Sequence, residues 1–402
     1  MKETIFLIAC ITLFCTSCHK EECASFDNVW EEDVCFFGEN LKSKHKDLFF
    51  NIPQVEYDYD INTLQSNTST LSELDIIIGL KKVISKIGDS HTGIQIGTRL
   101  TPVPLRVQWF DDGIYITGIA TSQEMYLGKK VIGIEGISID IVLDSLKTVI
   151  AYENESNFKN QVIGFLQVVD FYKYFDFISN AEELNITIEN GDNITLYPKD
   201  KVVVSLPIPE LPLFLKRQNE FYWFEELPGE GLMYIQYNAC AEIDNYPFST
   251  FTDEISERIN INNSIKKIVL DLRHNGGGNS EVALPLITKL DDLVSSSRLQ
   301  SSDIYVIISR KTFSSAILNA IELRKKISPI FIGEHTGGKP NHYGEVKDFF
   351  LPNSRLKVRY SSKYFKLLDT DEDALYPDIK VNYNYHHYIS SLDPIMDRIL
   401  AF

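Results

Sequence analysis

Residues 267–278 read KIVLDLRHNGGG, and they give the clearest indication of the fold class. Its first six residues form an apolar run with the length and composition of a buried strand, and a glycine triplet follows after three polar residues. Two further apolar runs, each expected to be a strand, lie downstream. Predicted helices separate the three runs, so that the order is strand 267–272, helix 280–290, strand 304–308, helix to 326 and strand 330–332. Such alternation predicts a parallel sheet with right-handed crossovers and places this part of the chain in the α/β class.

Two polar turns follow the first two predicted strands. One holds Gly276 and Gly277, and the other holds Ser314 and Ser315. If the strands are neighbours, about 4.8 Å apart, both turns lie at the sheet edge where α/β proteins bind ligands. Uncovered glycine N–H groups and the N–H of Ser315 could then hold an oxyanion, with the Ser314 hydroxyl as nucleophile. A tight turn and a helix N-cap are the structural alternatives.

These residues resemble the tail-specific, or C-terminal-processing, serine protease family. Residues 268–278 are similar to its DLRxNxGG signature, and residues 312–316 (TFSSA) are similar to its nucleophile segment. Residues 333–339 (GEHTGGK) are similar to its GExTxGK stretch, and residues 376–379 (YPDI) to its closing PDI. The resemblance implies a ClpP/crotonase-like α/β protease core and a serine endopeptidase that needs no cofactor. It also implies Ser314 as nucleophile and oxyanion donors near Gly276, Gly277 and Ser315.

The resemblance leaves two candidates for the general base. Lys339 lies 25 residues after Ser314, the spacing of the branch that uses a Ser–Lys dyad. A lysine base must be desolvated, however, and the flanking Gly and Pro residues indicate an exposed turn. Residues 88–92 (GDSHT) resemble the Ser–His pair of the tricorn-core branch, which implies His91 as base and Ser90 as its support. Histidine titrates near neutrality without special burial, so we favour His91, with a packing histidine as the structural alternative.

In the tricorn-core branch an acidic residue near the chain end supports the site, which here implies Asp371 or Glu372. Both belong to the acidic run 369–373, which is more typical of a solvated loop than of a Ca²⁺ site. The pair at 386–387 is two histidines without spaced partners, so no metal site is predicted. We expect residues 341–345 to line the cleft, with Glu345 as a further acidic candidate.

The first residues of the chain have the layout of an export signal. Lys2 precedes an apolar run at 5–14, which is too short to span a bilayer. A cysteine after small residues resembles the bacterial lipoprotein signal, which implies lipid attachment at Cys18. We therefore expect an exported protein that is lipid-anchored to the bacterial cell envelope, at its periplasmic face or at the cell surface. In such a protein Cys23 could pair with Cys35, and Cys240 is expected to be a buried thiol.

Hydrophobic periodicity predicts a helical segment and then a β-rich one ahead of the core. Apolar residues recur at spacings of three and four between 26 and 87, and alternate with polar ones between 103 and 197. Residues 126–136 resemble the LGDxIxxING stretch of bacterial PDZ domains, which capture peptide tails by strand addition. The predicted organisation is a lipoprotein signal peptide at 1–17, a helical domain at 18–98, a PDZ-like domain at 99–205 and the protease domain at 206–402.

Composition limits the class of protein. The 402 residues carry 56 acidic and 39 basic groups, and a net charge of −17 makes nucleic acid an unfavourable partner. With 44% hydrophobic and 24% charged residues, neither a disordered chain nor a multi-span membrane protein is expected. The expected partners are a peptide or unfolded protein substrate and, through the anchor, a membrane; the oligomeric state is not predicted. The alternative function is a non-catalytic binder of peptides or apolar ligands, as in the retinoid-carrying relatives of the family.

Overall fold

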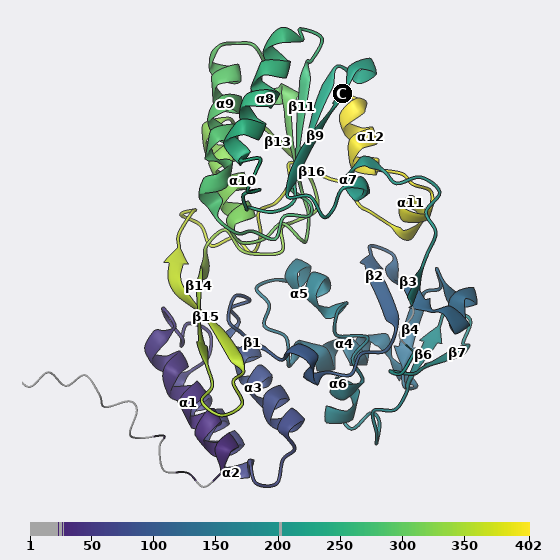
Figure 1. Ribbon diagram of the computed structural model, residues 1–402, viewed down its shortest axis with the longest axis vertical. Coiled ribbons are helices and arrows are strands. Elements are labelled where there is room, and N and C mark those ends of the chain that lie inside the picture. Colours follow the sequence, from purple (N-terminus) through teal and green to yellow (C-terminus); the bar gives the residue numbers. More distant parts are fainter. Residues whose placement is uncertain (1–22, 24–25, 27, 201–202) are drawn as a thin grey trace, which may run out of the picture.

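A six-stranded sheet forms the centre of the C-terminal half of the molecule (Figure 1). The computed structural model describes residues 23, 26, 28–200 and 203–402. The three apolar runs of the sequence are adjacent parallel strands, as expected. The strand order is β16 (Ile379–Lys380), β13 (Ile330–Gly333), β12 (Ile304–Ile308), β11 (Lys267–Asp271), β10 (Leu232–Tyr237) and β9 (Tyr222–Leu227), of which β9 alone runs antiparallel to its neighbour within this sheet.

Helices cover both faces of this sheet because successive strand residues point to opposite sides. Ile268 and Leu270 pack in one core with three helices, whereas Val269 packs in another with the last helix of the chain. The three helices are α8 (Phe248–Ile261), α9 (Leu284–Ser295) and α10 (Ser315–Lys326), and the last is α12 (Pro394–Leu400). Two short helices, α7 (Leu213–Lys216) and α11 (Tyr385–Ile389), lie in the connections. The Gly turn and the Ser turn therefore emerge side by side at the carboxyl ends of β11 and β12.

The N-terminal helical segment consists of α1 (Val29–Lys44), α2 (Gln54–Asn67) and α3 (Glu73–Ile87). Ser72 and Asp75 form a capping box at the start of α3, and Gly88, at a φ of 74°, ends it. The predicted pairing of Cys23 with Cys35 is present, and Cys240 is a buried thiol.

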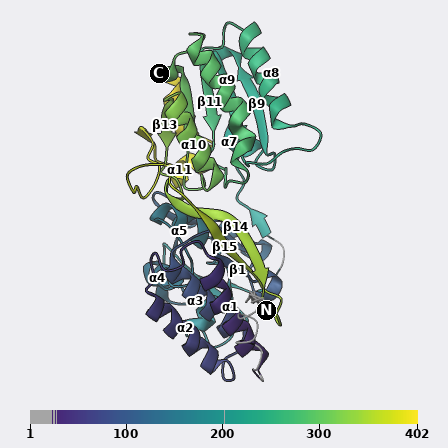
Figure 2. The same ribbon diagram turned by 90° about the vertical axis from the view of Figure 1, so that its left-hand side faces the viewer.

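A long hairpin leaves the core and joins the helical segment. It consists of β14 (His342–Phe350) and β15 (Lys357–Phe365), and β15 also pairs with the short strand β1 (Gly93–Gln95). Leu356 and Val358 pack in one core with residues of α1 and α3. Figures 1 and 2 show the hairpin running from the core down beside these helices. The hairpin thus belongs in space to the helical unit, although its sequence lies inside the segment 206–402.

The middle of the chain forms a separate β-rich unit beside the helical one (Figure 1). Its three-stranded sheet contains β2 (Leu105–Phe110), β3 (Gly113–Ala120) and β8 (Val203–Ser205). Its four-stranded sheet contains β4 (Val131–Ile134), β5 (Ile137–Ser138), β6 (Leu184–Ile188) and β7 (Asn193–Leu196). Three helices pack with them, namely α4 (Ile139–Lys147), α5 (Glu155–Val162) and α6 (Val169–Tyr174).

Among the helices of the described residues, none has the length and apolar character that crossing a membrane requires. The expected signal peptide and the expected lipidation site, Cys18, lie outside the described residues.

Candidate active site

Ser314 occupies the sharp turn between β12 and α10. Its backbone has a φ of 52° and a ψ of −125°, a conformation that is uncommon for residues other than glycine and that clusters at functional sites. Although Ser314 is in the N-cap position, its side chain makes no capping hydrogen bond to α10. Helix α10 begins at Ser315, whose N–H is among the first-turn groups that have no partner within a helix. The turn therefore presents a free hydroxyl next to the positive end of a helix dipole.

The glycine turn after β11 lies directly against Ser314. A Cβ atom on Gly277 would lie 2.8 Å from the Ser314 Cβ and 3.0 Å from the Ser315 nitrogen, so this contact requires glycine. The Gly277 N–H donates to Asn275 Oδ1 over 2.9 Å and is used inside the turn. Gly276 has open space beside it and lines the same cavity as Ser315. Of the three expected oxyanion donors, the structure therefore leaves Gly276 and Ser315 facing the cavity and places Gly277 in a supporting position.

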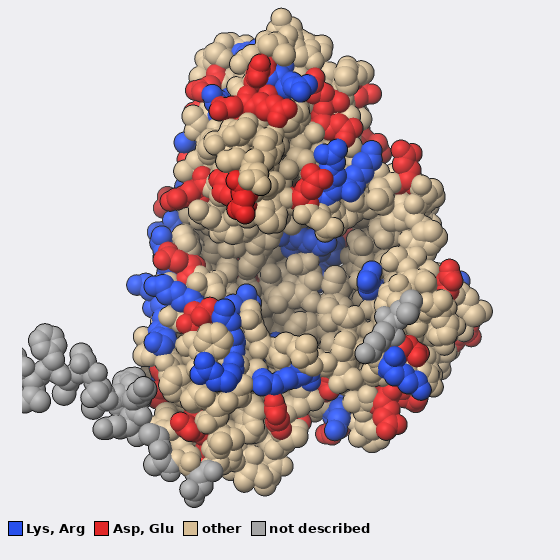
Figure 3. All heavy atoms as spheres, viewed as in Figure 1, with Lys and Arg blue, Asp and Glu red and all other residues tan. Residues whose placement is uncertain are grey.

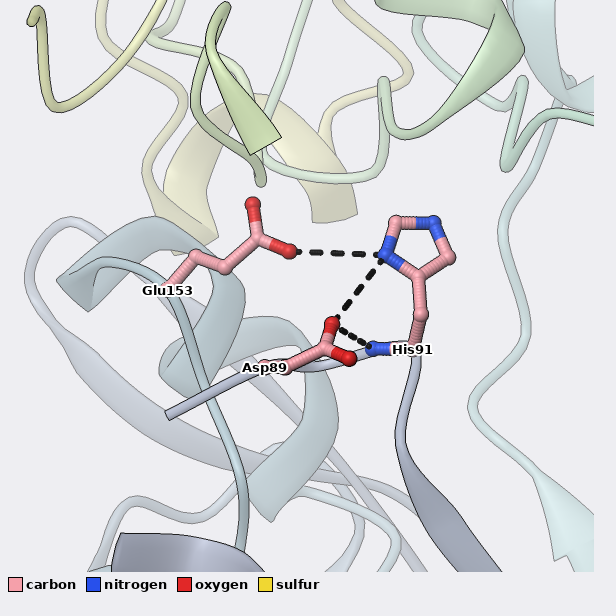
Figure 4. Close-up of side chains that lie close together, drawn as sticks. All are labelled: Asp89, His91 and Glu153. Carbon is pink, nitrogen blue, oxygen red and sulfur yellow. Dashed lines mark hydrogen bonds and ion pairs between the residues drawn. The ribbon is translucent and has the colours of Figure 1, made fainter. Parts of the chain in front are cut away.

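His91 lies in the connection between α3 and β1 and is buried. Its imidazole stacks on the ring of Phe313, with 4.5 Å between the centroids, directly beside the Ser314 turn. Nδ1 lies 3.5 Å from Glu153 Oε1 and 3.6 Å from Asp89 Oδ1, which are ion-pair contacts longer than regular hydrogen bonds (Figure 4). Nε2 points away from both carboxylates (Figure 4), and neither ring nitrogen has a regular hydrogen bond to any residue that the structure describes.

Other groups hold the two carboxylates in place. Asp89 accepts hydrogen bonds from the His91 N–H at 2.9 Å and from Thr92 Oγ1 at 2.5 Å, and it contacts His45 Nε2 at 3.1 Å. Glu153 accepts bonds from Ser90 Oγ at 2.6 Å and from the Lys339 N–H at 3.0 Å. Ser90, expected to steady His91, therefore acts on it through Glu153.

These carboxylates decide the charge of His91. Burial alone would lower the pKa of His91, but its contacts with Asp89 and Glu153 outweigh burial and raise the pKa to about 9. Burial would raise the pKa of Asp89, but the bonds from His45 and His91 hold it well below its usual range. His91 is therefore an imidazolium at neutral pH and becomes a proton acceptor as the pH approaches 9.

Asp89, His91 and Glu153 are also a set of groups that could hold a metal ion, since one ligand atom from each lies within 4.8 Å of the others. Both carboxylates already accept hydrogen bonds from fixed donors. The arrangement fits a positively charged histidine held between two carboxylates. The pair His386–His387 has no part in this cluster.

Ser314 and His91 line one cavity with a volume of about 730 Å³. The loop and hairpin residues at 341–345 contribute to its wall, as expected, through His342 and Glu345. His342 also stacks on His91, with 5.6 Å between the ring centroids. Burial lowers the pKa of His342, which keeps this second imidazole neutral beside the charged one. Such a cavity is large enough for several residues of an extended peptide.

The remaining predicted site residues lie elsewhere. The Lys339 ammonium pairs with Asp373 at 3.0 Å and lines a neighbouring cavity together with Asp371, not the cavity of Ser314. Glu372 lines a further hollow beside α10. At the position expected for Asp371 or Glu372, beside the histidine, the structure places Glu153 and Asp89.

Sequence reasoning missed both of these carboxylates. Asp89 lies within the motif 88–92, and an Asp two residues ahead of His91 is well placed to accept the His91 N–H, as in an Asx turn. Glu153 comes from the connection before α5, and no local pattern distinguishes it from other surface acids.

The fold is an α/β core joined to a helical and a β-rich unit, with the Ser314 cavity at the edge of the core sheet. No family model matches the sequence, and no curated protein matches it. Among solved structures, mature CPAF complexed with lactacystin is 12% identical over 92% of this chain and 97% of that chain, with a TM-score of 0.62. Mature CPAF gives 13% identity, coverage of 92% and 96%, and a TM-score of 0.60. A weaker likeness, with a TM-score of 0.44, is to a photosystem II D1 C-terminal processing protease, at 12% identity over 88% of this chain and 94% of that chain. The chain thus has the fold of CPAF, and the expected α/β protease fold class is confirmed.

Proposed function

We propose that this protein is a serine endopeptidase that cleaves peptides or protein tails, with Ser314 as nucleophile and His91 as general base. One observation carries the proposal: the uncapped Ser314 hydroxyl lines the same cavity as His91, whose Nε2 has no hydrogen-bond partner among the described residues. A structural N-cap serine would bond its helix, and a packing histidine would have both nitrogens satisfied.

The chemistry follows from these positions. Ser314 Oγ attacks the carbonyl carbon of the substrate while His91 Nε2 accepts the hydroxyl proton. The N–H groups of Ser315 and Gly276 hold the oxyanion of the tetrahedral intermediate. His91 then gives its proton to the leaving amine. In the second half, His91 deprotonates a water molecule that attacks the acyl carbon, and the proton passes from His91 to Ser314 Oγ as the acyl–oxygen bond breaks. Glu153 and Asp89 stabilise the imidazolium that forms in each half of the reaction.

A fluorophosphonate probe tests the proposal, because it reacts covalently with an activated serine. The wild-type protein should label at pH 9, and Ser314→Ala should not. Ser315→Ala is the matched control, since it keeps the Ser314 hydroxyl and the backbone N–H at position 315. Absence of labelling in the wild type, or labelling that survives Ser314→Ala, would favour the alternative of a non-catalytic binder.

We also propose that the protein is exported and lipid-anchored through Cys18. The leader sequence supports this, and so does the Cys23–Cys35 disulfide, since disulfides persist in oxidising compartments. Metabolic labelling with an alkyne fatty acid should mark the full-length protein and fail to mark Cys18→Ser.

For the β-rich unit we propose that residues 99–205 dock the tail of the substrate by strand addition, supported by their PDZ-like stretch. A photo-crosslinking tail peptide should attach within 99–205 in Ser314→Ala. Attachment confined to the core would contradict this role.

A further inference from the structure

A second histidine, His342, lines the cavity of Ser314. It is the first residue of β14 and is buried. Its ring stacks on two others, that of His91 at 5.6 Å and that of Phe365 at 5.4 Å between the centroids. The cavity of the nucleophile therefore holds two imidazoles whose rings are in contact.

The hydrogen bonds of His342 determine which of its ring nitrogens carries a proton. Nδ1 lies 2.9 Å from the carbonyl oxygen of Lys339 and 3.2 Å from that of Pro340. A carbonyl oxygen only accepts hydrogen bonds, so Nδ1 is the donor. In a neutral imidazole the other nitrogen, Nε2, is then an acceptor. The ring is neutral at pH 7 because burial lowers the pKa of His342.

This acceptor nitrogen is free to bind a molecule that enters the cavity. Within the part of the chain that the structure describes, no hydrogen bond reaches His342 Nε2. His342 also lines the neighbouring cavity of about 360 Å³, together with Glu153 and Lys339. Figure 3 shows that the molecule is hollowed between the core and the two units below it, which lets water enter the junction of the three units.

The two nucleophiles of a serine peptidase differ in how many hydrogens they carry. The Ser314 hydroxyl has one, and His91 Nε2 suffices to accept it during acylation. The water that hydrolyses the acyl-enzyme has two, of which only one passes to His91. A second acceptor in the same cavity restricts the rotation of this water and aligns its oxygen for attack. Such an acceptor matters in the second half of the reaction and not in the first.

We propose that His342 Nε2 accepts a hydrogen bond from the hydrolytic water and orients it toward the acyl carbon on Ser314. His91 takes one proton from this water while the water oxygen forms its bond to the acyl carbon. The bond from that carbon to Ser314 Oγ then breaks as His91 gives the proton to Oγ. The second hydrogen, held by His342, leaves with the carboxylic acid product. This inference rests on the proposed peptidase function and adds a residue that serves its second half.

Hydrolysis of a peptidyl 4-nitrophenyl ester by the full-length protein at pH 9 separates the two halves. The initial burst of nitrophenolate measures acylation of Ser314, and the steady rate that follows measures hydrolysis of the acyl-enzyme. His342→Asn places an amide nitrogen near the position of Nδ1, so it keeps the donor to the Lys339 carbonyl and removes the acceptor. It should leave the burst rate within about twofold of the wild type and lower the steady rate about tenfold.

The opposite substitution distinguishes this role from a structural one. His342→Gln places an amide oxygen near the position of Nε2, so it keeps the acceptor and loses the donor. Its steady rate should stay within about threefold of the wild type. If the donor alone matters, His342→Gln loses activity and His342→Asn does not, which would overturn the proposal. His335→Asn is the matched control, because His335 stacks on Tyr376 and lines neither cavity, and both of its rates should remain those of the wild type.

Methanol distinguishes a lost water position from a weakened base. Like the serine hydroxyl, methanol has one hydroxyl hydrogen and needs only His91. In a mixture of methanol and water, the acyl-enzyme of His342→Asn should therefore form about tenfold more methyl ester relative to acid than the wild type forms. This ratio does not depend on which half of the reaction limits turnover. A ratio equal to that of the wild type would refute the role of His342.

The role of His342 and the peptidase function can fail separately. If the wild type gives no nitrophenolate and the fluorophosphonate probe does not label Ser314, the peptidase function fails, and the water position fails with it. If Ser314 labels and His342→Asn hydrolyses the acyl-enzyme as fast as the wild type, the peptidase stands and the water position alone is refuted.

Discussion

Replacing Glu153 by Gln should move the pH dependence of turnover toward lower pH. In the wild type the acid limb of kcat/KM reports the pKa of free His91, which lies at about 9. Activity should therefore rise about tenfold per pH unit between pH 6 and 8 and level off above 9. Removal of one carboxylate weakens the hold on the imidazolium, so the neutral base becomes available at a lower pH.

The distance in the structure sets the size of the shift. Two unit charges 3.5 Å apart interact by about 4 to 5 kcal/mol at an effective dielectric constant of about 20. That energy corresponds to about three pKa units. The Gln amide oxygen can still face His91, and Asp89 remains at 3.6 Å, so we expect a net shift of about one to two units. The plateau should also fall, because a less basic His91 is a weaker general base.

Cleavage of a fluorogenic peptide, assayed from pH 6 to 10.5, measures the acid limb of the wild type and of Glu153→Gln. Each curve is normalised to its own plateau. Glu345→Gln is the control, because Glu345 lines the same cavity but pairs with Lys363; its limb should stay within about 0.3 units of the wild type. The reasoning is refuted if the limb of Glu153→Gln remains where the wild-type limb is. A wild-type limb below pH 7 would refute it as well, since the Glu153–His91–Asp89 contacts could then not govern the base.

Three further predictions test the site. His91→Ala should reduce kcat/KM about 100-fold or more, while Lys339→Ala should weaken turnover less; the reverse order would give the role of base to Lys339. Gly277→Ala should lower the free energy of unfolding by about 1 to 3 kcal/mol in urea titrations and abolish Ser314 labelling, whereas Gly229→Ala, in open space, should change little. Because the folded pKa of His91 lies above its unfolded value of about 6.5, its stabilising charge is fully present below pH 6.5 and lost as pH rises through 9. Stability should accordingly decline from pH 7 to 9.5 in the wild type and decline less in His91→Phe, and an identical decline in both would contradict this linkage.

The strand–turn–helix units of the core were predictable because their signals are local. Residues 267–278 contain both the buried strand and the turn that ends it, and the same holds for the turn at Ser314. The sequence places the β14–β15 hairpin within the predicted protease domain, yet the hairpin packs against helices that lie about 260 to 330 residues earlier in the chain. An amphipathic hairpin shows in its sequence that it needs a partner surface, but not which surface that is.

The residues of the candidate site likewise differ in whether a local sequence signal identifies them. Ser314 and His91 were found because each sits in a short motif. Glu153 was not found, because its role depends on where the connection before α5 meets the core. Lys339 illustrates the difference. The sequence predicts its ammonium as a candidate general base, whereas in the structure its backbone N–H donates to Glu153 and its ammonium pairs with Asp373.

Ser314, His91 and Glu153 come from three different units of the molecule: the core, the helical unit and the β-rich unit. None of these units holds a complete set of reacting groups. A displacement of one unit by about 1 to 2 Å would separate His91 from Ser314 while each hydrophobic core stayed intact. A displacement of that size is enough to prevent proton transfer between them. The turnover rate would then depend on the relative position of the three units. A tether or a bound chain end that displaces one of them would change this rate without contacting Ser314.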